Sequence, residues 1–117
     1  MTQSASFGSA IDAIRVRFCE RTIGERARLD AWRKALAAEG DEIQPAEVAA
    51  ALAQYAHRLA GTAGSLGFEE LSRQATAAEA VAAAVADPSR SIDDERRALR
   101  AAAGALLEEI DKLGTRN

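Results

Sequence analysis

The chain contains a single histidine, His57, and the residues that share its helical face are small. At about 100° per residue, the neighbours of His57 on that face are Ala53, Ala60, Gly61 and Gly64. None of these side chains can shield an imidazole ring, so we expect His57 to be exposed. Glycine inside a helix costs roughly 0.5–1 kcal/mol relative to alanine, which suggests close approach by another molecule.

A carboxylate that could orient this ring is expected on the next helix. The chain is predicted to turn at residues 65–67, which places residues about ten before the turn opposite residues about ten after it. This geometry brings Glu79 within reach of His57. A carboxylate that accepts a hydrogen bond from Nδ1–H would fix the ring and leave Nε2 unprotonated as a nucleophile. Simple fraying of the helix before its turn is the alternative, but it explains Gly61 poorly.

Several other chemistries are excluded by the same residues. One histidine cannot supply the paired Glu-x-x-His ligands of a ferritin-like metal site. Gly61, Gly64 and Gly67 follow a helical stripe and lack the spacing and strand of a phosphate-binding loop or dinucleotide fingerprint. The lone cysteine, Cys19, excludes an internal disulfide and is interpreted as a packing residue. We therefore expect no intrinsic cofactor, no metal site and no ATP-dependent kinase activity.

The composition indicates one soluble all-α domain over residues 1–117. The chain has 29 alanines and 10 leucines, which favour helix, and few of the branched and aromatic residues that favour strands. A formal net charge of −3 argues against a nucleic-acid partner. No apolar run is long enough to span a bilayer, and the first nine residues do not resemble a signal peptide. We expect a cytoplasmic protein without a membrane partner.

The elements that must position His57 are predicted as an antiparallel four-helix bundle preceded by a short extra N-terminal helix. The predicted helices cover about residues 6–21, 22–39, 45–64, 68–86 and 91–113. Gly24 is the expected joint between the first two, and Gly40 is a C-terminal stop. Pro45 suits the first position of a helix, the segment 87–89 breaks one, and Ser91 opens the last.

Apolar residues at helical spacing define the predicted faces. A leading stripe comprises Phe7, Ile11, Ile14 and Phe18. The stripes of the later helices comprise Val48, Leu52, Tyr55 and Leu59, then Phe68, Leu71, Ala75, Ala78, Ala82 and Val85, and finally Leu99, Ala103, Leu106, Ile110 and Leu113. The helix at 22–39 has Ile23, Ala27, Leu29, Trp32 and Leu36, and this helix and the three later ones can bury their stripes against one another.

The run AHRLAGTAGSLG at residues 56–67, followed by Leu71 and Glu79, resembles the histidine phosphotransfer (HPt) domains of bacterial two-component phosphorelays. The resemblance covers about residues 48–85, and the flanking helices match only in length and amphipathicity. It implies that His57 is phosphorylated on Nε2, that Glu79 orients the ring, and that Gly61 gives the partner room to dock.

One position departs from the family pattern. HPt domains usually have a lysine three residues after the histidine, and this chain has Ala60. Loss of that cation would slow transfer or shorten the life of the phosphohistidine, because positioned cations stabilise a transferring phosphoryl group. Arg58 is a partial substitute. Arg58, Ala60, Gly61 and Gly64 are therefore the predicted docking or phosphate-proximal positions.

The resemblance implies a phosphorelay intermediate that accepts and donates a phosphoryl group on His57, in exchange with the aspartate of a response-regulator receiver domain. A hybrid histidine kinase is the second implied partner. Mg²⁺ is expected on the receiver and not on this chain, which we expect to be a monomer. Two alternatives stay open: an HPt-like adaptor that docks to a receiver or kinase without phosphotransfer, and a plain structural helical bundle.

Overall fold

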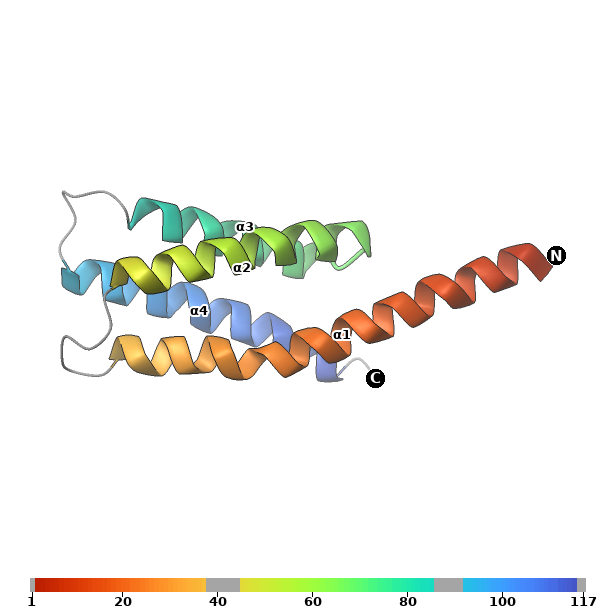
Figure 1. Ribbon diagram of the computed structural model, residues 1–117, viewed down its shortest axis with the longest axis horizontal. Coiled ribbons are helices and arrows are strands. Elements are labelled where there is room, and N and C mark those ends of the chain that lie inside the picture. Colours follow the sequence, from red (N-terminus) through yellow and green to blue (C-terminus); the bar gives the residue numbers. More distant parts are fainter. Residues whose placement is uncertain (1, 38–44, 86–91, 116–117) are drawn as a thin grey trace.

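The computed structural model describes residues 2–37, 45–85 and 92–115, and every element within these ranges is an α-helix. The helices are α1 (Thr2–Ala37), α2 (Pro45–Ser65), α3 (Glu69–Ala84) and α4 (Ile92–Thr115). Successive helices run in opposite directions, with α2 packed against α3, α1 against α4, and α3 against α4 (Figure 1). The predicted all-α four-helix bundle is confirmed. No described helix is both long enough and apolar enough to cross a lipid bilayer.

The apolar stripes of α2, α3 and α4 form the core as predicted. Every predicted core position on these helices is buried except Phe68, which is half-buried and stacks on Phe18 with ring centroids 5.2 Å apart. After Leu71, the buried residues of α3 are all alanines. Because alanine projects only a methyl group, α3 can pack closely against α2 and α4.

The predicted division of the first segment is wrong, because α1 is one continuous helix. The expected joint, Gly24, lies exposed within it. A glycine in a helix interior costs about 1 kcal/mol, and the buried residues Thr22 and Leu29 on either side hold the helix against the bundle. The short extra helix at 6–21 is therefore the first half of α1.

The N-terminal part of α1 projects beyond the other three helices (Figure 1). Arg15 marks the point of departure, since its Nε donates a hydrogen bond of 2.9 Å to the carbonyl of Leu66 in the turn after α2. The residues before Arg15 extend the helix by about 20 Å. The leading apolar stripe is therefore not a core face along its whole length: Phe18 is buried, whereas Ile14 is 43% exposed.

The remaining predicted boundaries agree with the structure to within two residues where it describes them. α2 begins at Pro45, where the missing N–H of proline has no intrahelical partner to lose. The predicted helices 68–86 and 91–113 correspond to α3 and α4. The predicted stop at Gly40, the break at 87–89 and the cap at Ser91 lie outside the described residues.

Candidate functional site

A tight turn between α2 and α3 sets the register of these two helices. Gly67 has a positive φ of 87°, which only glycine adopts without strain. The N–H of Phe68 bonds to the carbonyl of Ala63 at 2.8 Å, and the N–H of Gly67 bonds to that of Gly64 at 3.3 Å. These two bonds form a Schellman motif, which ends α2 and directs the chain back along it.

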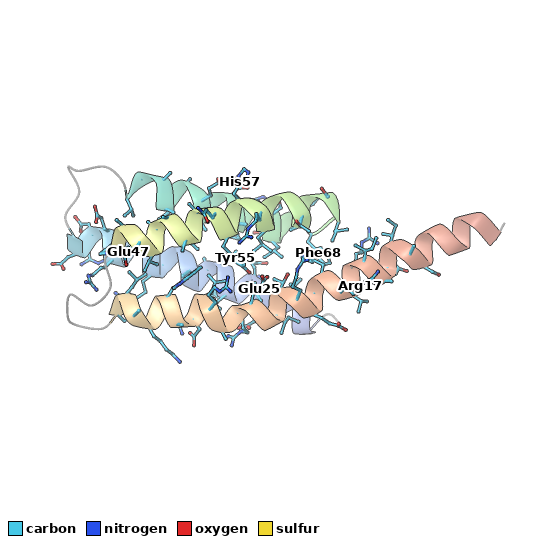
Figure 2. All side chains as sticks on the ribbon, viewed as in Figure 1. Arg17, Glu25, Glu47, Tyr55, His57 and Phe68 are labelled. Carbon is cyan, nitrogen blue, oxygen red and sulfur yellow. The ribbon has the colours of Figure 1, made fainter. Side chains whose placement is uncertain are left out.

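His57 and Glu79 meet across the two helices that this turn joins. Each residue lies eleven positions from Phe68, so the fold-back places them at the same height. The Nδ1 atom of His57 lies 2.9 Å from Oε2 of Glu79. The histidine side chain is 76% exposed and the glutamate side chain 36% exposed. Figure 2 shows His57 on the outside of the bundle, whereas Tyr55, two residues earlier, points inward.

This contact defines the tautomer of the ring. An ionised carboxylate can only accept a hydrogen bond, so the proton between the two residues belongs to Nδ1 of His57. The Nε2 atom then carries the lone pair, and it makes no hydrogen bond to any other described residue. The arrangement is that of an exposed, oriented nitrogen nucleophile.

Gly61 and Gly64, the two glycines that follow His57 on α2, are explained by different structural features. A methyl group added at Gly61 would meet no atom of the surrounding described chain within 4 Å, so nothing inside the molecule requires a glycine there. At Gly64 the same methyl group would lie 3.2 Å from Oγ of Ser72. Gly61 therefore leaves space outside the molecule, whereas Gly64 allows α2 and α3 to come together.

Ser72 fixes the spacing of the two helices at this point. Its Oγ donates a hydrogen bond of 2.8 Å to the carbonyl of Ala60, one turn after His57. Ala60 itself is half-buried against the core. This hydrogen bond thus links α3 to the main chain of Ala60, the position that departs from the family pattern.

A groove between α1 and α2 runs beside His57. It has a volume of about 780 Å³, and its lining includes Arg58 and Gly61 from α2. Arg21 and Ile14 line it from α1, and Ile14 is one of the large exposed apolar residues of the chain. We call this feature the α1/α2 groove. The α1/α2 groove is thus lined by two arginines and an exposed apolar residue as well as by His57.

The inner wall of the α1/α2 groove contains Tyr55, which packs edge-on against Trp32 of α1 with ring centroids 6.3 Å apart. Burial of the phenol raises the pKa of Tyr55, and the nearby carboxylate of Glu25 raises it further. Oη of Tyr55 and Oγ1 of Thr22 are buried without a hydrogen-bond partner among the described residues. The groove therefore has a polar but uncharged floor.

The described residues contain no group of three or more His, Cys, Asp or Glu side chains that could hold a metal ion. In a comparison with protein-family models, the model of the Hpt domain matches residues 18–115. The chain belongs to the Hpt domain family. No curated protein and no solved structure gives a significant match.

Membership of the Hpt family extends the resemblance beyond the two central helices. The match begins at Phe18, where α1 enters the bundle, and it includes α4 up to Thr115. The projecting residues at the N-terminus lie outside it. The match thus includes α1 from Phe18 onward, together with α2, α3 and α4.

Sequence reasoning singled out His57, Glu79 and Gly61; the structure brings His57 and Glu79 into contact, and Gly61 lies one turn after His57 on α2. Sequence reasoning did not predict the hydrogen bond of Ser72. The signal was present, because Ser72 and Gly64 are each four residues from Phe68 and the fold-back that pairs His57 with Glu79 pairs them too. The predicted Arg58 lines the α1/α2 groove with His57, and so does Arg21, which sequence reasoning did not assign to the site.

Proposed function

We propose that this chain is a phosphorelay intermediate in which His57 exchanges a phosphoryl group with the aspartate of a response-regulator receiver domain. The supporting observation is the 2.9 Å contact between Nδ1 of His57 and Oε2 of Glu79, on a histidine side chain that is 76% exposed. A histidine held in this way presents Nε2 outward in the form that can attack phosphorus.

The transfer is an in-line displacement. The lone pair of Nε2 attacks the phosphorus of the receiver's aspartyl phosphate, the N–P bond forms, and the P–O bond to the aspartate breaks. The aspartate leaves as a free carboxylate, and the Nδ1 proton stays in its hydrogen bond to Glu79. The positive charge that develops on the ring lies beside that carboxylate. The reverse reaction returns the phosphoryl group, and water takes no part.

The α1/α2 groove is the proposed docking surface for the receiver. Ile14 supplies exposed apolar area at its N-terminal end, and the space over Gly61 lets the partner's main chain approach the imidazole. Arg58 and Arg21 line the same groove and complement the acidic pocket of a receiver. We propose that these arginines supply part of the positive charge that HPt domains usually have as a lysine at the position of Ala60. Mg²⁺ belongs to the receiver in this proposal, and the chain needs no cofactor.

The proposal is tested by incubating the protein with a receiver domain that carries labelled phosphate. We expect label on the wild-type chain that is stable in base and lost in acid, as a phosphohistidine requires. His57→Gln should acquire none. Glu47→Gln is the matched control, because Glu47 is an exposed residue in the first turn of the same helix, and this variant should be labelled like the wild type.

The same experiment distinguishes the two other functions that the sequence leaves open. A wild-type chain that binds the receiver but takes up no label would be an adaptor, in which the change to Ala60 has abolished transfer. A chain that neither binds nor takes up label from any receiver tested would be a structural bundle. Either result would overturn the phosphorelay proposal.

A further inference from the structure

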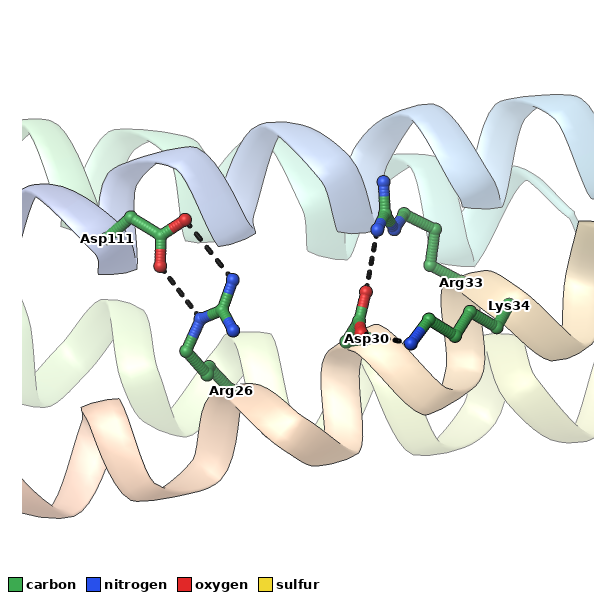
Figure 3. Close-up of polar contacts among 5 residues, drawn as sticks. All are labelled: Arg26, Asp30, Arg33, Lys34 and Asp111. Atoms are coloured by element: carbon green, nitrogen blue, oxygen red, sulfur yellow. Dashed lines mark hydrogen bonds and ion pairs between the residues drawn. The ribbon is translucent and has the colours of Figure 1, made fainter.

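A second groove lies between the C-terminal part of α1 and the N-terminal half of α4. Its lining consists of Arg33, Lys34, Ala37, Arg97, Arg100, Ala101 and Gly104, and its volume is about 390 Å³. We call it the basic groove. None of its lining residues comes from α2 or α3, and none is shared with the α1/α2 groove. Figure 3 shows the α1 side of this region, with Arg33 directed toward α4.

The charges of the basic groove are only partly neutralised. Asp30 contacts both Arg33, at 2.7 Å, and Lys34, at 3.0 Å, so one carboxylate serves two cations. The hydrogen bond from Arg33, with that from Lys34, lowers the pKa of Asp30, which therefore stays ionised. Arg97 lies 3.7 Å from Asp94, and both side chains are mostly exposed.

Arg100 completes the set, and it makes no hydrogen bond or ion pair to another described residue. Among the described residues, the groove thus collects four cations from two helices, and two carboxylates contact them, in a chain whose net charge is −3. In an acidic protein, such a cluster of cations, with one exposed arginine that no described residue pairs, is a surface that attracts anions.

The floor of the basic groove is kept open by a glycine that the fold does not require. Gly104 lies in the interior of α4, where glycine weakens a helix. A methyl group added there would meet no atom of the surrounding described chain within 4 Å. Gly61 beside His57 has the same property. Gly8 and Gly24 are also open, but they line neither groove.

We infer that the basic groove docks an acidic segment of a partner protein, with Asp or Glu side chains paired to Arg97 and Arg100 and the segment's main chain lying over Gly104. A groove between two helices that is lined by arginines and by the small residues Ala101 and Gly104 suits a peptide with carboxylates. Because the two grooves share no residue, an acidic segment can stay bound while a receiver occupies His57.

The test uses a fluorescein-labelled peptide of eight glutamates, with binding measured by fluorescence anisotropy at low salt. The matched glutamine peptide is the probe for binding that does not depend on charge. We expect the glutamate peptide to bind the wild type, and Arg97→Ala/Arg100→Ala to weaken binding about tenfold, the effect of losing two direct charge contacts. Gly104→Leu should also weaken it, although it removes no charge.

The control variant is Arg17→Ala/Arg28→Ala, which removes two exposed arginines of α1 that lie outside the basic groove. Its affinity for the peptide should stay within about twofold of the wild type, and circular dichroism should show all variants folded. Equal weakening in both double variants would mean that the peptide responds only to overall charge. That result, equal binding of the glutamine peptide, or binding to phosphatidylglycerol vesicles without binding to the peptide, would overturn the inference.

Discussion

The α2–α3 pair and the α1–α4 pair are stabilised by different kinds of polar contact. Between α2 and α3, the hydroxyl of Ser72 bonds to the carbonyl of Ala60, in a partly buried position next to Gly64. Between α1 and α4, the guanidinium of Arg26 forms an ion pair with Asp111, at 2.7 Å and 3.2 Å, on an exposed surface (Figure 3). The first kind of contact is partly buried and fixes a side chain to the main chain, whereas the second joins two side chains that are about half exposed.

This difference matches what each pair has to do. The imidazole of His57 needs the carboxylate of Glu79 at one distance and in one orientation, and small residues with short hydrogen bonds to the main chain fix the register that supplies it. The charged surface of α1 and α4 needs no such precision, because long cationic side chains adjust to the ligand. The reactive group therefore lies on the rigid pair and the basic groove on the adaptable one.

The largest expected effect compares Gly61 of the α1/α2 groove with Gly104 of the basic groove. Gly61→Leu should lower the rate of phosphoryl transfer from a receiver about 100-fold, because a bulky side chain beside His57 displaces the docked partner from the attacking nitrogen. Gly104→Leu should leave that rate unchanged. Both substitutions meet open space, so the thermal midpoint of each variant should equal or exceed that of the wild type.

The measurement is the rate of label transfer, with the midpoint followed by circular dichroism. A Gly61→Leu variant that transfers as fast as the wild type would show that no partner approaches this surface. Slow transfer in both glycine variants would show instead that α4 contributes to receiver docking and that the two faces are not separate.

The second-largest expected effect concerns the orientation of the His57 imidazole. Glu79→Gln keeps the size of the side chain but removes the charge that favours the proton on Nδ1. We expect transfer to slow about tenfold, the equivalent of one hydrogen bond of about 1.4 kcal/mol. Nitrogen chemical shifts of the imidazole should show a mixture of tautomers in the variant and a single Nδ1–H tautomer in the wild type. A single unchanged tautomer in the variant would remove Glu79 from the mechanism.

The sequence predicted the α2–α3 pair better than it predicted α1. Local rules were sufficient for α2 and α3, because a glycine-ended helix, a short turn and a second stripe determine which residues face each other. His57 and Glu79 could therefore be paired by counting from the turn. The hydrogen bond of Ser72 was not predicted, because a serine on a helix face does not show its partner until its distance from Ala60 is known.

The prediction for α1 failed because it depended on tertiary contacts. Gly24 interrupts the local pattern, but burial of Thr22 and Leu29 in the bundle outweighs one glycine. The apolar spacing of the first residues looked like a core stripe, and only the length of α1 relative to the other helices shows that Ile14 lies where the core ends. The basic groove was equally hidden, since Arg33 and Arg100 are distant in the sequence and meet only when α4 lies against α1.

The packing of α2 against α1 can be tested through the ionisation of the buried Tyr55 at high pH. Burial raises the pKa of this phenol, so the folded state keeps it neutral after the unfolded chain has begun to ionise near pH 10. Its contribution to stability is present below about pH 10 and is lost as the pH rises. Urea unfolding of the wild type should therefore lose about 1.4 kcal/mol more than that of Tyr55→Phe between pH 8 and pH 11.

At pH 8 the Tyr55→Phe variant should be as stable as the wild type or more stable, because the buried Oη has no hydrogen-bond partner among the described residues. A wild type that loses no more stability than the variant at high pH would place the phenol in contact with solvent. That outcome would also contradict a closed inner wall for the α1/α2 groove.

The smallest expected effects are the losses in free energy of unfolding when the contact of Ser72 or that of Arg26 is removed. Ser72→Ala should lower the free energy of unfolding by about 1 kcal/mol, because it removes a partly buried hydrogen bond to Ala60. Arg26→Ala should lower it by about 0.5 kcal/mol or less, because both partners of that ion pair are about half exposed. In 1 M NaCl the effect of Arg26→Ala should vanish through screening, whereas that of Ser72→Ala should persist. If salt changed the effects of the two substitutions equally, the distinction between a rigid and an adaptable helix pair would be wrong. If the contact between His57 and Glu79 were undisturbed in Ser72→Ala, the turn alone would hold the register of α2 and α3.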